Sequence, residues 1–541
     1  MTTETTDPYT LVLFTAQSGA LSARLDHDDG SILHLHSLVD PENETVCFSD
    51  LQFWGDRILL SGCGLGYHLK RAIGSIISET RILLAEYYDE LAERCLELFP
   101  PEIRGRVTVI TKGESRVTEK VREFLAGGHY VQVVKHPPSW HAHREYYRSI
   151  AAQCSGTPLP RQADTVLMLQ GNFFLEKELS AASAGSTAKV LPFNYNDHAT
   201  IIAYESEFQK RLQKDRPAAV LSINLLGVDG NGILAEYCRR AGIPLIVWFV
   251  DDPRPILLNR MQHLSEGVIV FSWERAYLPW LRQQGFGDAR YLPLASDPAQ
   301  FAVPRTRRPS VGCAFVGTAM GSSFLKEIAE KFMWKPEYAR VAAAVAFRIC
   351  SERNSDVDRL LDDECATQSV VLPLDSDHTR TWLRSYCIHT ASMIMRKRMV
   401  TGLLSSGIET FGDPEGWREL AGPGLTVHGT IDYRTEIGDC YRSIAVNLNC
   451  TSCQMPTAVN QRVFDVPLSG AFIINDDQSD LHELFAENEY VTYSSVEECA
   501  EKVAFYRENE SARTAVSDTA RKRILGEHTY THRLQSLLHF K

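Results

Sequence analysis

The sequence lacks any run of about 18 consecutive apolar residues, the length that a membrane-spanning helix needs. It also lacks fixed-period repeats and low-complexity segments, which excludes solenoids, collagen-like chains and long coiled coils. The opening residues, MTTETTDPYT, contain no basic stretch followed by an apolar core, so they do not resemble a secretory signal. We therefore expect a cytoplasmic protein without a transmembrane segment.

Positive charge is in short supply, because 56 lysines and arginines face 68 acidic residues and give a net charge of -12. Such a chain lacks the overall basic surface of a nucleic-acid-binding protein, so no nucleic acid is expected as a partner, although a local basic groove stays open. The 13 cysteines are odd in number and scattered, which favours a reducing compartment over a disulfide framework. One Cys-x-x-Cys, Cys450 to Cys453, has no second pair nearby, and we predict no metal there.

The length of 541 residues predicts three or four domains, at about 150 residues per domain. Strand-like apolar runs alternate with helix-like segments along the chain, a pattern typical of parallel sheets with helices on both faces. The loop CSGTPLPRQAD and the Pro- and Arg-rich segment SDPAQFAVPRTRRPS mark two boundaries. The predicted fold class is α/β, with three units at residues 1–158, 159–308 and 309–541.

The first unit contains a glycine-rich turn, Gly62-x-Gly64-x-Gly66, directly after an apolar run. Glu86 ends the next apolar run, twenty residues after Gly66, which is the spacing expected for an adenosine-bearing cofactor. This arrangement resembles S-adenosylmethionine methyltransferases, but Leu60 stands where that family usually has an acid. Catalytic methylation, ligand binding without methylation, and a docking or structural module all stay open for this unit.

Three histidines of the first unit, His136, His141 and His143, invite a metal site. Because Pro137 and Pro138 interrupt the segment and no clear partner carboxylate accompanies it, we predict a loop without a metal. The strings GLGYHLKRAI and HPPSWHAHREYYRSI resemble motility accessory factor proteins, which are linked to sugar modification of flagellin. That resemblance implies a Rossmann-like core for the first unit.

Two acids end a buried strand of the second unit, where PLIVWFVDDPRPI places Asp251 and Asp252. Ligands of α/β proteins bind at the carboxyl ends of strands, so either acid is a candidate base for deprotonating an acceptor hydroxyl. An Asp-Pro turn with a helix cap is the alternative. Further candidates for the acceptor side are Gly171, at the first strand-to-helix turn, and Asn224 and Asp229, for which turn-forming roles are equally open.

The third unit contains the segment TSCQMPTAVNQRVFDVPLSGAFIINDD, which predicts a helix carrying Asp465, a small-residue turn and an apolar strand. A carboxylate in this place can accept two hydrogen bonds from a ribose diol. Arg462 precedes Asp465 by three residues and shares its helix face, and its planar fork of donors suits a diphosphate. A surface ion pair between the two is the alternative.

Other segments of the third unit add candidates for the same ligand. The string VGTAMGS follows a strand and precedes a helix, so its backbone N–H groups can approach a phosphate. The triplet Arg396, Lys397 and Arg398 offers cations for a pyrophosphate, with a solvated basic turn as the alternative. The full set of donor-binding candidates is Gly317, Thr318, Arg396, Arg398, Tyr433, Asn449, Asn460, Arg462 and Asp465.

The C-terminal part of the chain resembles the bacterial CgeB-type, spore-maturation-protein-like glycosyltransferases, which are relatives of the GT-B transferases. The resemblance is carried by NQRVFDVPLSGAFIINDDQSDLHELF, YSSVEECAEKVAFY and RKRILGEHTYTHRL, and it is strongest from residue 395 onward. Asp465, the turn Leu468-Ser469-Gly470 and the segment His528-Thr529-Tyr530 match the family pattern. Thr457 stands where the wider group has an earlier acid.

The resemblance implies two Rossmann-like domains in a GT-B arrangement, preceded by an additional N-terminal Rossmann-like domain. It implies a nucleotide-sugar donor linked to UDP, GDP or dTDP, no metal, and an acceptor hydroxyl on a protein such as flagellin or on a surface glycan. Asp465 would bind the ribose, Arg462 would face the phosphates, and Tyr433 would lie near the base. The alternative function is an S-adenosylmethionine-dependent methyltransferase or cofactor-binding protein acting through the first unit; a non-catalytic scaffold is a third.

Overall fold

The computed structural model describes residues 7–47, 51–77, 79–128, 131–154, 161–198, 201–230, 232–258, 267–302, 309–332, 334–352, 356–372 and 376–539. Its contacts divide the chain into two compact units. The N-terminal unit contains Met1–Thr165, Phe193–Ala218 and Ile233–Pro244, and the C-terminal unit contains Val166–Pro192, Ala219–Gly232 and Leu245–Lys541. Residues 155–160 of the first predicted boundary and 303–308 of the second lie outside the described residues.

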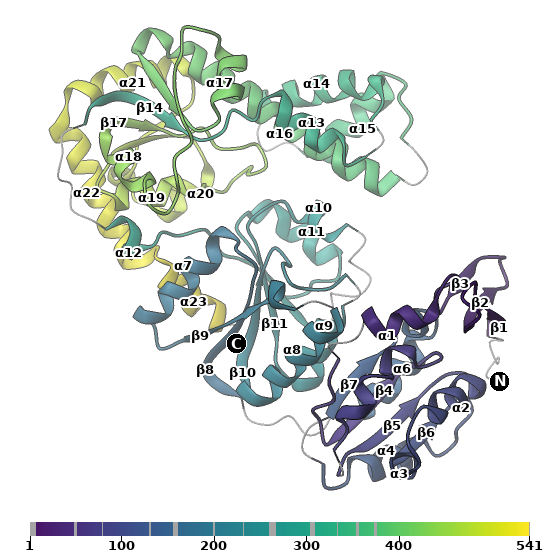
Figure 1. Cartoon of the computed structure of the whole chain (residues 1–541). Coiled ribbons are helices and arrows are strands. Elements are labelled where there is room, and N and C mark those ends of the chain that lie inside the picture. Colours follow the sequence, from purple (N-terminus) through teal and green to yellow (C-terminus); the bar gives the residue numbers. More distant parts are fainter. Residues whose placement is uncertain are drawn as a thin grey trace. The chain divides into compact units, whose positions relative to one another are not determined.

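A four-stranded parallel sheet is the centre of the N-terminal unit (Figure 1). Its strands β4 (Arg57–Ser61), β5 (Arg81–Ala85), β6 (Val107–Ile110) and β7 (Val131–Lys135) have the order β6-β5-β4-β7. β4 is buried along its whole length, as expected for a central parallel strand. The strand order reverses between β4 and β7, so the glycine-rich turn and His136 follow the two strands at the switch point.

The N-terminal unit also has a three-stranded antiparallel sheet, β1 (Tyr9–Thr15), β2 (Leu21–His27) and β3 (Ile32–His34). Its helices are α1 (Glu44–Cys47), α2 (Asp89–Glu97), α3 (Pro101–Arg104), α4 (Val117–Leu125), α5 (Pro137–Ala142), α6 (Arg144–Gln153), α8 (Ile201–Asp215) and α9 (Ile233–Ala241). α8 joins this unit although it follows residue 158 in sequence, because the Gln209 side chain bonds both the N–H and the C=O of Val133 in β7, at 2.8 Å each.

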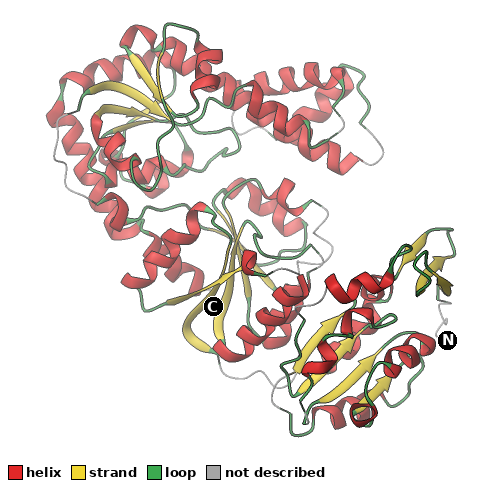
Figure 2. Cartoon of the chain, in the orientation of Figure 1, coloured by secondary structure: helices red, strands yellow, loops and turns green. Residues whose placement is uncertain are grey.

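The first of two six-stranded sheets in the C-terminal unit has the order β13-β12-β11-β10-β8-β9 (Figure 1, Figure 2). Its strands are β8 (Gln162–Gln170), β9 (Lys189–Asn194), β10 (Pro217–Ile223), β11 (Leu245–Phe249), β12 (Val268–Ser272) and β13 (Ala289–Tyr291). The pairs β10–β11, β11–β12 and β12–β13 are parallel. α7 (Phe174–Ala182), α10 (Pro253–Leu257) and α11 (Leu278–Gln283) follow strands of this sheet. The strand order reverses between β8 and β10, which places this sheet's ligand-binding edge after those two strands.

The second sheet has the order β16-β15-β14-β17-β18-β19 with every pair parallel. Its strands are β14 (Val311–Val316), β15 (Ile408–Phe411), β16 (Thr426–His428), β17 (Ile444–Leu448), β18 (Ile473–Asp476) and β19 (Thr492–Tyr493). This is the strand order of a dinucleotide-binding Rossmann sheet, whose switch point lies between the first and fourth strands in sequence. Here those strands are β14 and β17, so the loops after Val316 and Leu448 meet at the ligand-binding edge.

Helices α13 (Ser322–Ala329), α14 (Pro336–Ser351), α15 (Val357–Thr367) and α16 (Ser376–Gly402) separate β14 from β15 in sequence. Part of this insertion has a hydrophobic core of its own, centred on residues such as Tyr338, Val345 and Leu383. The apolar run VVLPL at 370–374, within this insertion, predicts a strand from its sequence alone. That prediction is wrong for residues 370–372, which form no strand, and residues 373 and 374 lie outside the described part of the chain.

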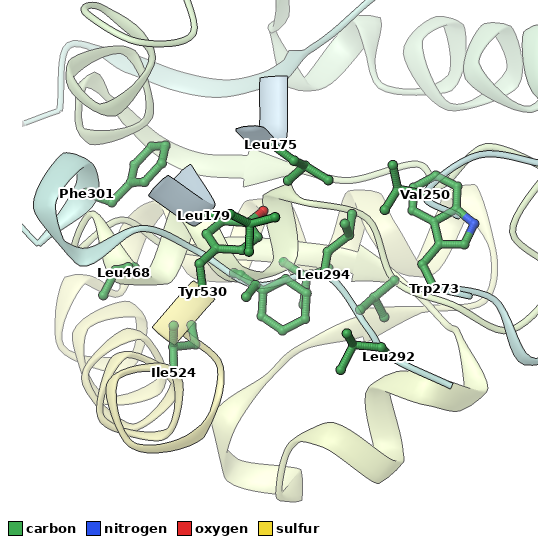
Figure 3. Packing of buried hydrophobic residues seen from close by; sticks show 14 of the residues in the cluster. Leu175, Leu179, Val250, Trp273, Leu292, Leu294, Phe301, Leu468, Ile524 and Tyr530 are labelled. Atoms are coloured by element: carbon green, nitrogen blue, oxygen red, sulfur yellow. The ribbon is translucent and has the colours of Figure 1, made fainter. Parts of the chain in front are cut away.

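The remaining helices of the C-terminal unit are α12 (Pro298–Phe301), α17 (Pro414–Ala421), α18 (Ile437–Ser443), α19 (Arg462–Leu468), α20 (Ser479–Leu484), α21 (Val496–Glu508), α22 (Glu510–Glu527) and α23 (Tyr530–Leu538). Its main core joins side chains from both six-stranded sheets with the segment between them and with α23 (Figure 3). Leu294 of that segment and Tyr530 of α23 are at most 2 % exposed there. The structure thus confirms the predicted α/β fold class of Rossmann-like parallel sheets. In the described residues, no helix combines the length and apolarity that crossing a membrane requires.

Candidate functional site

The loop after β14 lies at the switch point of the second six-stranded sheet. The Gly317 N–H donates to the Phe411 carbonyl at 2.8 Å, and the Gly317 carbonyl accepts from Trp417 Nε1 at 2.8 Å. Its φ of +155° favours glycine, and a Cβ there would lie 3.1 Å from the Phe315 ring and 3.3 Å from Arg462 Nη2. The loop backbone therefore lies close to a guanidinium because no side chain stands between them.

Two of the candidate arginines, Arg396 and Arg462, converge on this loop. Their guanidinium groups lie over the ring of Phe315, 5.5 Å and 5.1 Å from its centroid. Arg396 Nη1 donates to the Thr318 carbonyl at 2.7 Å and lies 3.3 Å from its hydroxyl. In the described part of the chain, the buried Nε atoms of both arginines have no hydrogen-bond partner. Arg396 is 4 % exposed, and burial together with the charge of Arg462 lowers its pKa to about 10.

Backbone donors complete this arrangement. Among the described residues, no acceptor is bonded to the N–H groups of residues 318–321. Gly321 is the N-cap of α13 and provides no side-chain cap for that helix. Donors of this kind at a helix N-terminus attract anions. The arginine pair and these N–H groups, which we call the arginine cradle (Gly317–Gly321, Arg396 and Arg462), thus have the chemistry of a phosphate site.

Arg398 lies outside the arginine cradle, unlike its neighbour two positions earlier. It is exposed on α16, and its guanidinium stacks on the ring of Phe347 at 5.0 Å from the centroid. Lys397 is exposed as well. The solvated-turn alternative therefore describes these two residues, whereas Arg396 alone of the triplet is buried.

Asp465 is fully buried on α19 and belongs to no surface ion pair. Its Oδ1 accepts from the Ser296 hydroxyl at 2.5 Å and from Gln461 Nε2 at 3.2 Å, and its Oδ2 accepts from the Tyr433 hydroxyl at 2.8 Å. Burial raises its pKa to about 7. Asp465 and Tyr433 are thus directly bonded to each other, and both carboxylate oxygens are engaged inside the protein. The Asp465 side chain connects α19 to the segment that follows β13.

Asn449 and Asn460 hold the start of α19 against the end of β17. Asn460 Nδ2 donates to Asn449 Oδ1 at 2.7 Å, and Asn460 Oδ1 accepts the N–H of Arg462 at 3.1 Å. Both asparagines are buried, at 1 % and 7 % exposure. Their contacts fix the backbone that carries Arg462, so in this structure they position the arginine cradle.

Glu274 is a residue that the sequence did not point to. It follows β12 and is fully buried. Its Oε2 accepts the N–H groups of Thr457 and Ala458 at 3.0 Å and 2.9 Å, and its Oε1 accepts the Thr457 hydroxyl at 2.5 Å. Burial raises the pKa of this carboxyl. A carboxylate therefore does lie beside Thr457, but it comes from the other sheet and no local pattern reveals it.

Asp251 and Asn224 meet at the edge of the first six-stranded sheet, where β11 and β10 end. Asn224 Nδ2 donates to Asp251 Oδ2 at 2.8 Å, and Asn224 Oδ1 accepts the N–H of Val250 at 2.9 Å. Asn224 and Leu225 have φ values of +51° and +59°, a left-handed conformation that costs non-glycine residues about 1–3 kcal/mol and is common at functional sites. Asp251 is half-buried, and burial raises its pKa to about 6. It is a carboxylate held in place and made more basic than usual.

Asp252 has a different environment from its neighbour. Its side chain accepts the Arg254 N–H at 3.1 Å as the N-cap of α10, and it is paired with the guanidinium groups of Arg384 and, at 3.6 Å, Arg254. Burial alone would raise its pKa, but these two cations lower it. The helix-cap alternative thus describes Asp252.

Gly171 and Asp229 lie in turns whose backbone groups bond to nearby residues of the same segment. Glu176 of α7 accepts the N–H groups of Gly171, Asn172 and Phe173 at 2.8–3.0 Å. The donors that could meet an acceptor substrate at this turn are therefore occupied by a carboxylate of the same chain. Asp229 is half-buried in the loop after β10, where its carbonyl accepts the Gly232 N–H at 3.4 Å.

In the glycine-rich turn of the N-terminal unit, backbone N–H groups are also bonded to a carboxylate of the same chain. Gly62, Gly64 and Gly66 have φ values of +75°, +50° and +75°, as a tight turn requires. Glu86, however, is fully buried: its Oε2 accepts the N–H groups of Cys63 and Gly64 at 2.7 Å and 3.1 Å, and its Oε1 accepts the Tyr147 hydroxyl at 2.7 Å. Both oxygens of the Glu86 carboxylate are thus bonded within the N-terminal unit, one of them to the glycine-rich turn itself. The structure does not support the methyltransferase alternative.

Most of the histidine segment at 136–143 forms helix α5 and not the predicted loop, because proline is compatible with the first turn of a helix. His136 and His143 lie at the two ends of that helix. His136 stacks on His36 and on His68, with centroids 4.9 Å and 5.0 Å apart. His36, Glu44 and His136 offer ligand atoms within 4.8 Å of one another. Both nitrogens of His36 have partners, since Nε2 accepts the Leu65 N–H at 2.8 Å and Nδ1 lies 2.7 Å from Glu44. These contacts hold the glycine-rich turn.

Comparison with known proteins gave a family match and several remote structural likenesses. Residues 393–539, which include both arginines of the arginine cradle, match the family model described as glycosyl transferase-like. No curated protein matches the chain. The chain is similar to sucrose-phosphate synthase from Thermosynechococcus elongatus, with a TM-score of 0.40 and 10% identity over 69% of this chain and 98% of that one.

Two further solved structures have comparable scores. Anabaena Alr3699/HepE, in complex with UDP, has a TM-score of 0.39 and 10% identity over 69% of this chain and 98% of that one. The β-glucosyltransferase of T4 phage has a TM-score of 0.35 and 8% identity over 69% of this chain and 99% of that one. At these scores the likenesses indicate neither the donor nor the acceptor.

Proposed function

We propose that this chain is a glycosyltransferase that moves a sugar from a nucleotide-sugar donor to an acceptor hydroxyl. The observation that carries the proposal is the arginine cradle at the switch point of a Rossmann sheet. Its two arginines lie within the stretch that matches a glycosyl transferase-like family model, and its loop precedes that stretch.

The diphosphate of the donor is the group that the arginine cradle would hold. Two guanidinium groups over one aromatic ring repel each other, and an anion between them relieves that repulsion. Arginine binds phosphate oxygens through two parallel N–H bonds. The same contacts would stabilise the negative charge that grows on the diphosphate as the sugar–phosphate bond breaks. Since these groups neutralise the leaving diphosphate, the proposed reaction requires no metal.

The other two turns at switch points support this assignment by contrast. Glu86 occupies the donors of the glycine-rich turn, and Glu176 occupies those of the Gly171 turn. A buried carboxylate in such a turn repels a phosphate and takes its hydrogen bonds. In the described residues, the turn at Gly317 is the one of the three whose backbone donors face arginines in place of a carboxylate.

Asp251 is the proposed base that accepts the proton of the acceptor hydroxyl. With a pKa raised to about 6, it is ionised at neutral pH and binds a proton more readily than an ordinary aspartate. Asn224 holds the carboxylate at the sheet edge. Asp252, which caps α10 and is ion-paired with Arg384, would support the wall of the site.

The contacts of Asp465 favour an anchoring role over direct binding of the ribose. A ribose diol would have to displace Ser296 or Tyr433 from the carboxylate, and both bonds are short. We propose that Asp465 fixes α19, and with it Arg462, relative to the segment after β13. Tyr433 remains our candidate neighbour of the nucleoside. The acceptor would be a protein such as flagellin or a surface glycan, reached in the cytoplasm.

Thermal unfolding with a panel of UDP, GDP, CDP, dTDP and S-adenosylhomocysteine tests the proposal. A ligand that binds only the native state stabilises it by about 2.7 kcal/mol at a hundredfold excess over Kd. We expect one nucleoside diphosphate to raise the unfolding temperature of the wild type, and Arg462→Ala to abolish most of the shift. Arg398→Ala is the matched control, because it removes an exposed arginine outside the arginine cradle. A shift with S-adenosylhomocysteine alone would contradict the proposal.

A further inference from the structure

A cavity of about 670 Å³ lies in the C-terminal unit, lined by the α10–α11 region and by helices α15 and α16 of the insertion. Its volume is within the range of about 300–1,000 Å³ that is usual for small-molecule sites. Its lining includes Trp280, Gln283 and Gln284 from α11 and its end, and Asp377 and Thr381 from α16. It is thus a polar, aromatic-lined site, formed by the insertion and the first six-stranded sheet's helices.

The charges around this cavity are balanced. Arg254, Arg380 and Arg384 line it, and each has an aspartate partner. Arg380 pairs with Asp362 at 2.6 Å, Arg384 pairs with Asp252, and Arg254 lies 3.7 Å from Asp358. A phosphate or a nucleic-acid backbone would find these cations already neutralised. The cavity therefore suits a neutral ligand, in contrast to the arginine cradle.

Trp280 provides a flat apolar surface among these polar groups. It is half-buried, and the Arg254 guanidinium lies 5.0 Å from its ring centroid, which helps to fix the orientation of the indole. The face of an aromatic ring carries partial negative charge and attracts the electropositive C–H groups of a sugar ring. Gln283, Gln284 and Thr381 can each donate and accept hydrogen bonds, and Asp377 can accept them. An aromatic face edged by such groups matches a polyhydroxylated ring.

The cavity wall is linked to the proposed base through the ion pair between Arg384 and Asp252 and the peptide bond between Asp252 and Asp251. Asp252, which follows Asp251 directly, is ion-paired with the cavity-lining Arg384. We infer that this cavity binds the acceptor and that the acceptor is a neutral carbohydrate; this inference rests on the proposed glycosyltransferase function.

Saturation-transfer NMR on the full chain tests the inference, with methyl glycosides of glucose, galactose, mannose, rhamnose and N-acetylglucosamine as probes. We expect at least one glycoside to bind, Trp280→Ala to weaken it at least tenfold, and Trp280→Phe to restore most of the binding. Phe347→Ala is the matched control, since it removes an aromatic side chain that is 59 % exposed on α14, away from the cavity. If Trp280→Ala does not fold, Gln283→Ala, at an exposed position of the lining, replaces it.

The nucleotide panel separates the two possible failures. If a nucleoside diphosphate binds and no glycoside does, or if glycoside binding is the same in Trp280→Ala and wild type, the carbohydrate inference is wrong and the proposed function stands. If no nucleoside diphosphate binds, the proposed function itself fails. Binding of the glycoside and the diphosphate together, with only the former lost in Trp280→Ala, supports both.

Discussion

The proposed role of Asp251 predicts a specific pH dependence of sugar transfer. Only the ionised carboxylate can accept the acceptor's proton, so kcat/KM should fall tenfold per pH unit below the pKa of Asp251. Because burial raises that pKa to about 6, the wild type should retain about half of its activity at pH 6 and about a tenth at pH 5. Asp251→Asn should lose at least about a hundredfold in kcat while it still binds the nucleoside diphosphate.

Asn224 makes this prediction quantitative. Its hydrogen bond to Asp251 lowers the pKa of the carboxyl and opposes the effect of burial. A hydrogen bond to a charged group is worth about 1.5–3 kcal/mol, and one pKa unit corresponds to about 1.4 kcal/mol. Since Asp251 is partly exposed, we take the lower end: removal of the amide should raise its pKa by about one unit. The acid limb of the profile should then move from about pH 6 to about pH 7.

Asn224→Gly is the variant for this test, because glycine accepts the φ of +51° at this position without strain. The assay measures release of nucleoside diphosphate from the donor between pH 5 and 8.5, with the unfolding temperature recorded at each pH. Asp252→Asn is the opposing variant. It breaks the ion pair with Arg384 and should lower the unfolding temperature, and because the charge of Asp252 helps to raise the pKa of Asp251, it should move the acid limb to lower pH. An acid limb at the same pH in Asn224→Gly and wild type would refute the reasoning.

Three further predictions concern buried carboxylates. Burial raises the pKa of Asp465 from 3.8 to about 7, so the folded state binds the proton more tightly than the unfolded state does, and wild-type stability should fall as the pH rises from about 4 to about 7. Asp465→Asn should flatten that part of the plot of unfolding temperature against pH, and an unchanged slope would contradict this prediction. Glu86→Ala leaves the buried N–H groups of Cys63 and Gly64 without their acceptor. The free energy of unfolding in urea should therefore fall by at least about 2 kcal/mol, whereas nucleotide affinity should stay the same. Weaker nucleotide binding would show that the glycine-rich turn takes part in the donor site. Glu274→Gln removes the charge that accepts the N–H groups of Ala276, Thr457 and Ala458. This change should lower the free energy of unfolding by about 1–2 kcal/mol, and an equal urea midpoint would show that these bonds add no stability.

The phosphate end of the candidate site could be predicted because its signals are local. A small-residue turn between a strand and a helix, and arginines within predicted helices, are recognisable in the sequence. The structure brings Gly317, Thr318, Arg396 and Arg462 together. The sequence could not separate Arg396 from Arg398. Residues two positions apart on a helix point in directions that differ by about 200°. The rotation of α16 about its axis relative to the sheet therefore decides which of the two arginines is buried.

Other features depend on contacts that no local pattern encodes. Glu86 has the right distance from the glycine-rich turn for a ribose-binding acid, but it folds back onto that turn's own N–H groups. Asp465 has the expected helix and turn, yet Ser296, a residue of the segment after β13, occupies it. Glu274 reaches Thr457 across 183 positions of sequence. The apolar residues of the run VVLPL fit a strand, whereas its described residues lie within the helical insertion, between α15 and α16.

The most direct test of the central claim compares the Kd of a nucleoside diphosphate with that of the same nucleoside without phosphates, by calorimetry at constant ionic strength. If the arginine cradle binds the diphosphate, the phosphates should strengthen wild-type binding, and Arg462→Ala should reduce this gain by about ten- to a hundredfold, because a charged hydrogen bond is worth about 1.5–3 kcal/mol. Arg398→Ala should keep the full gain. A gain from the phosphates that is equal in wild type and Arg462→Ala would contradict the account.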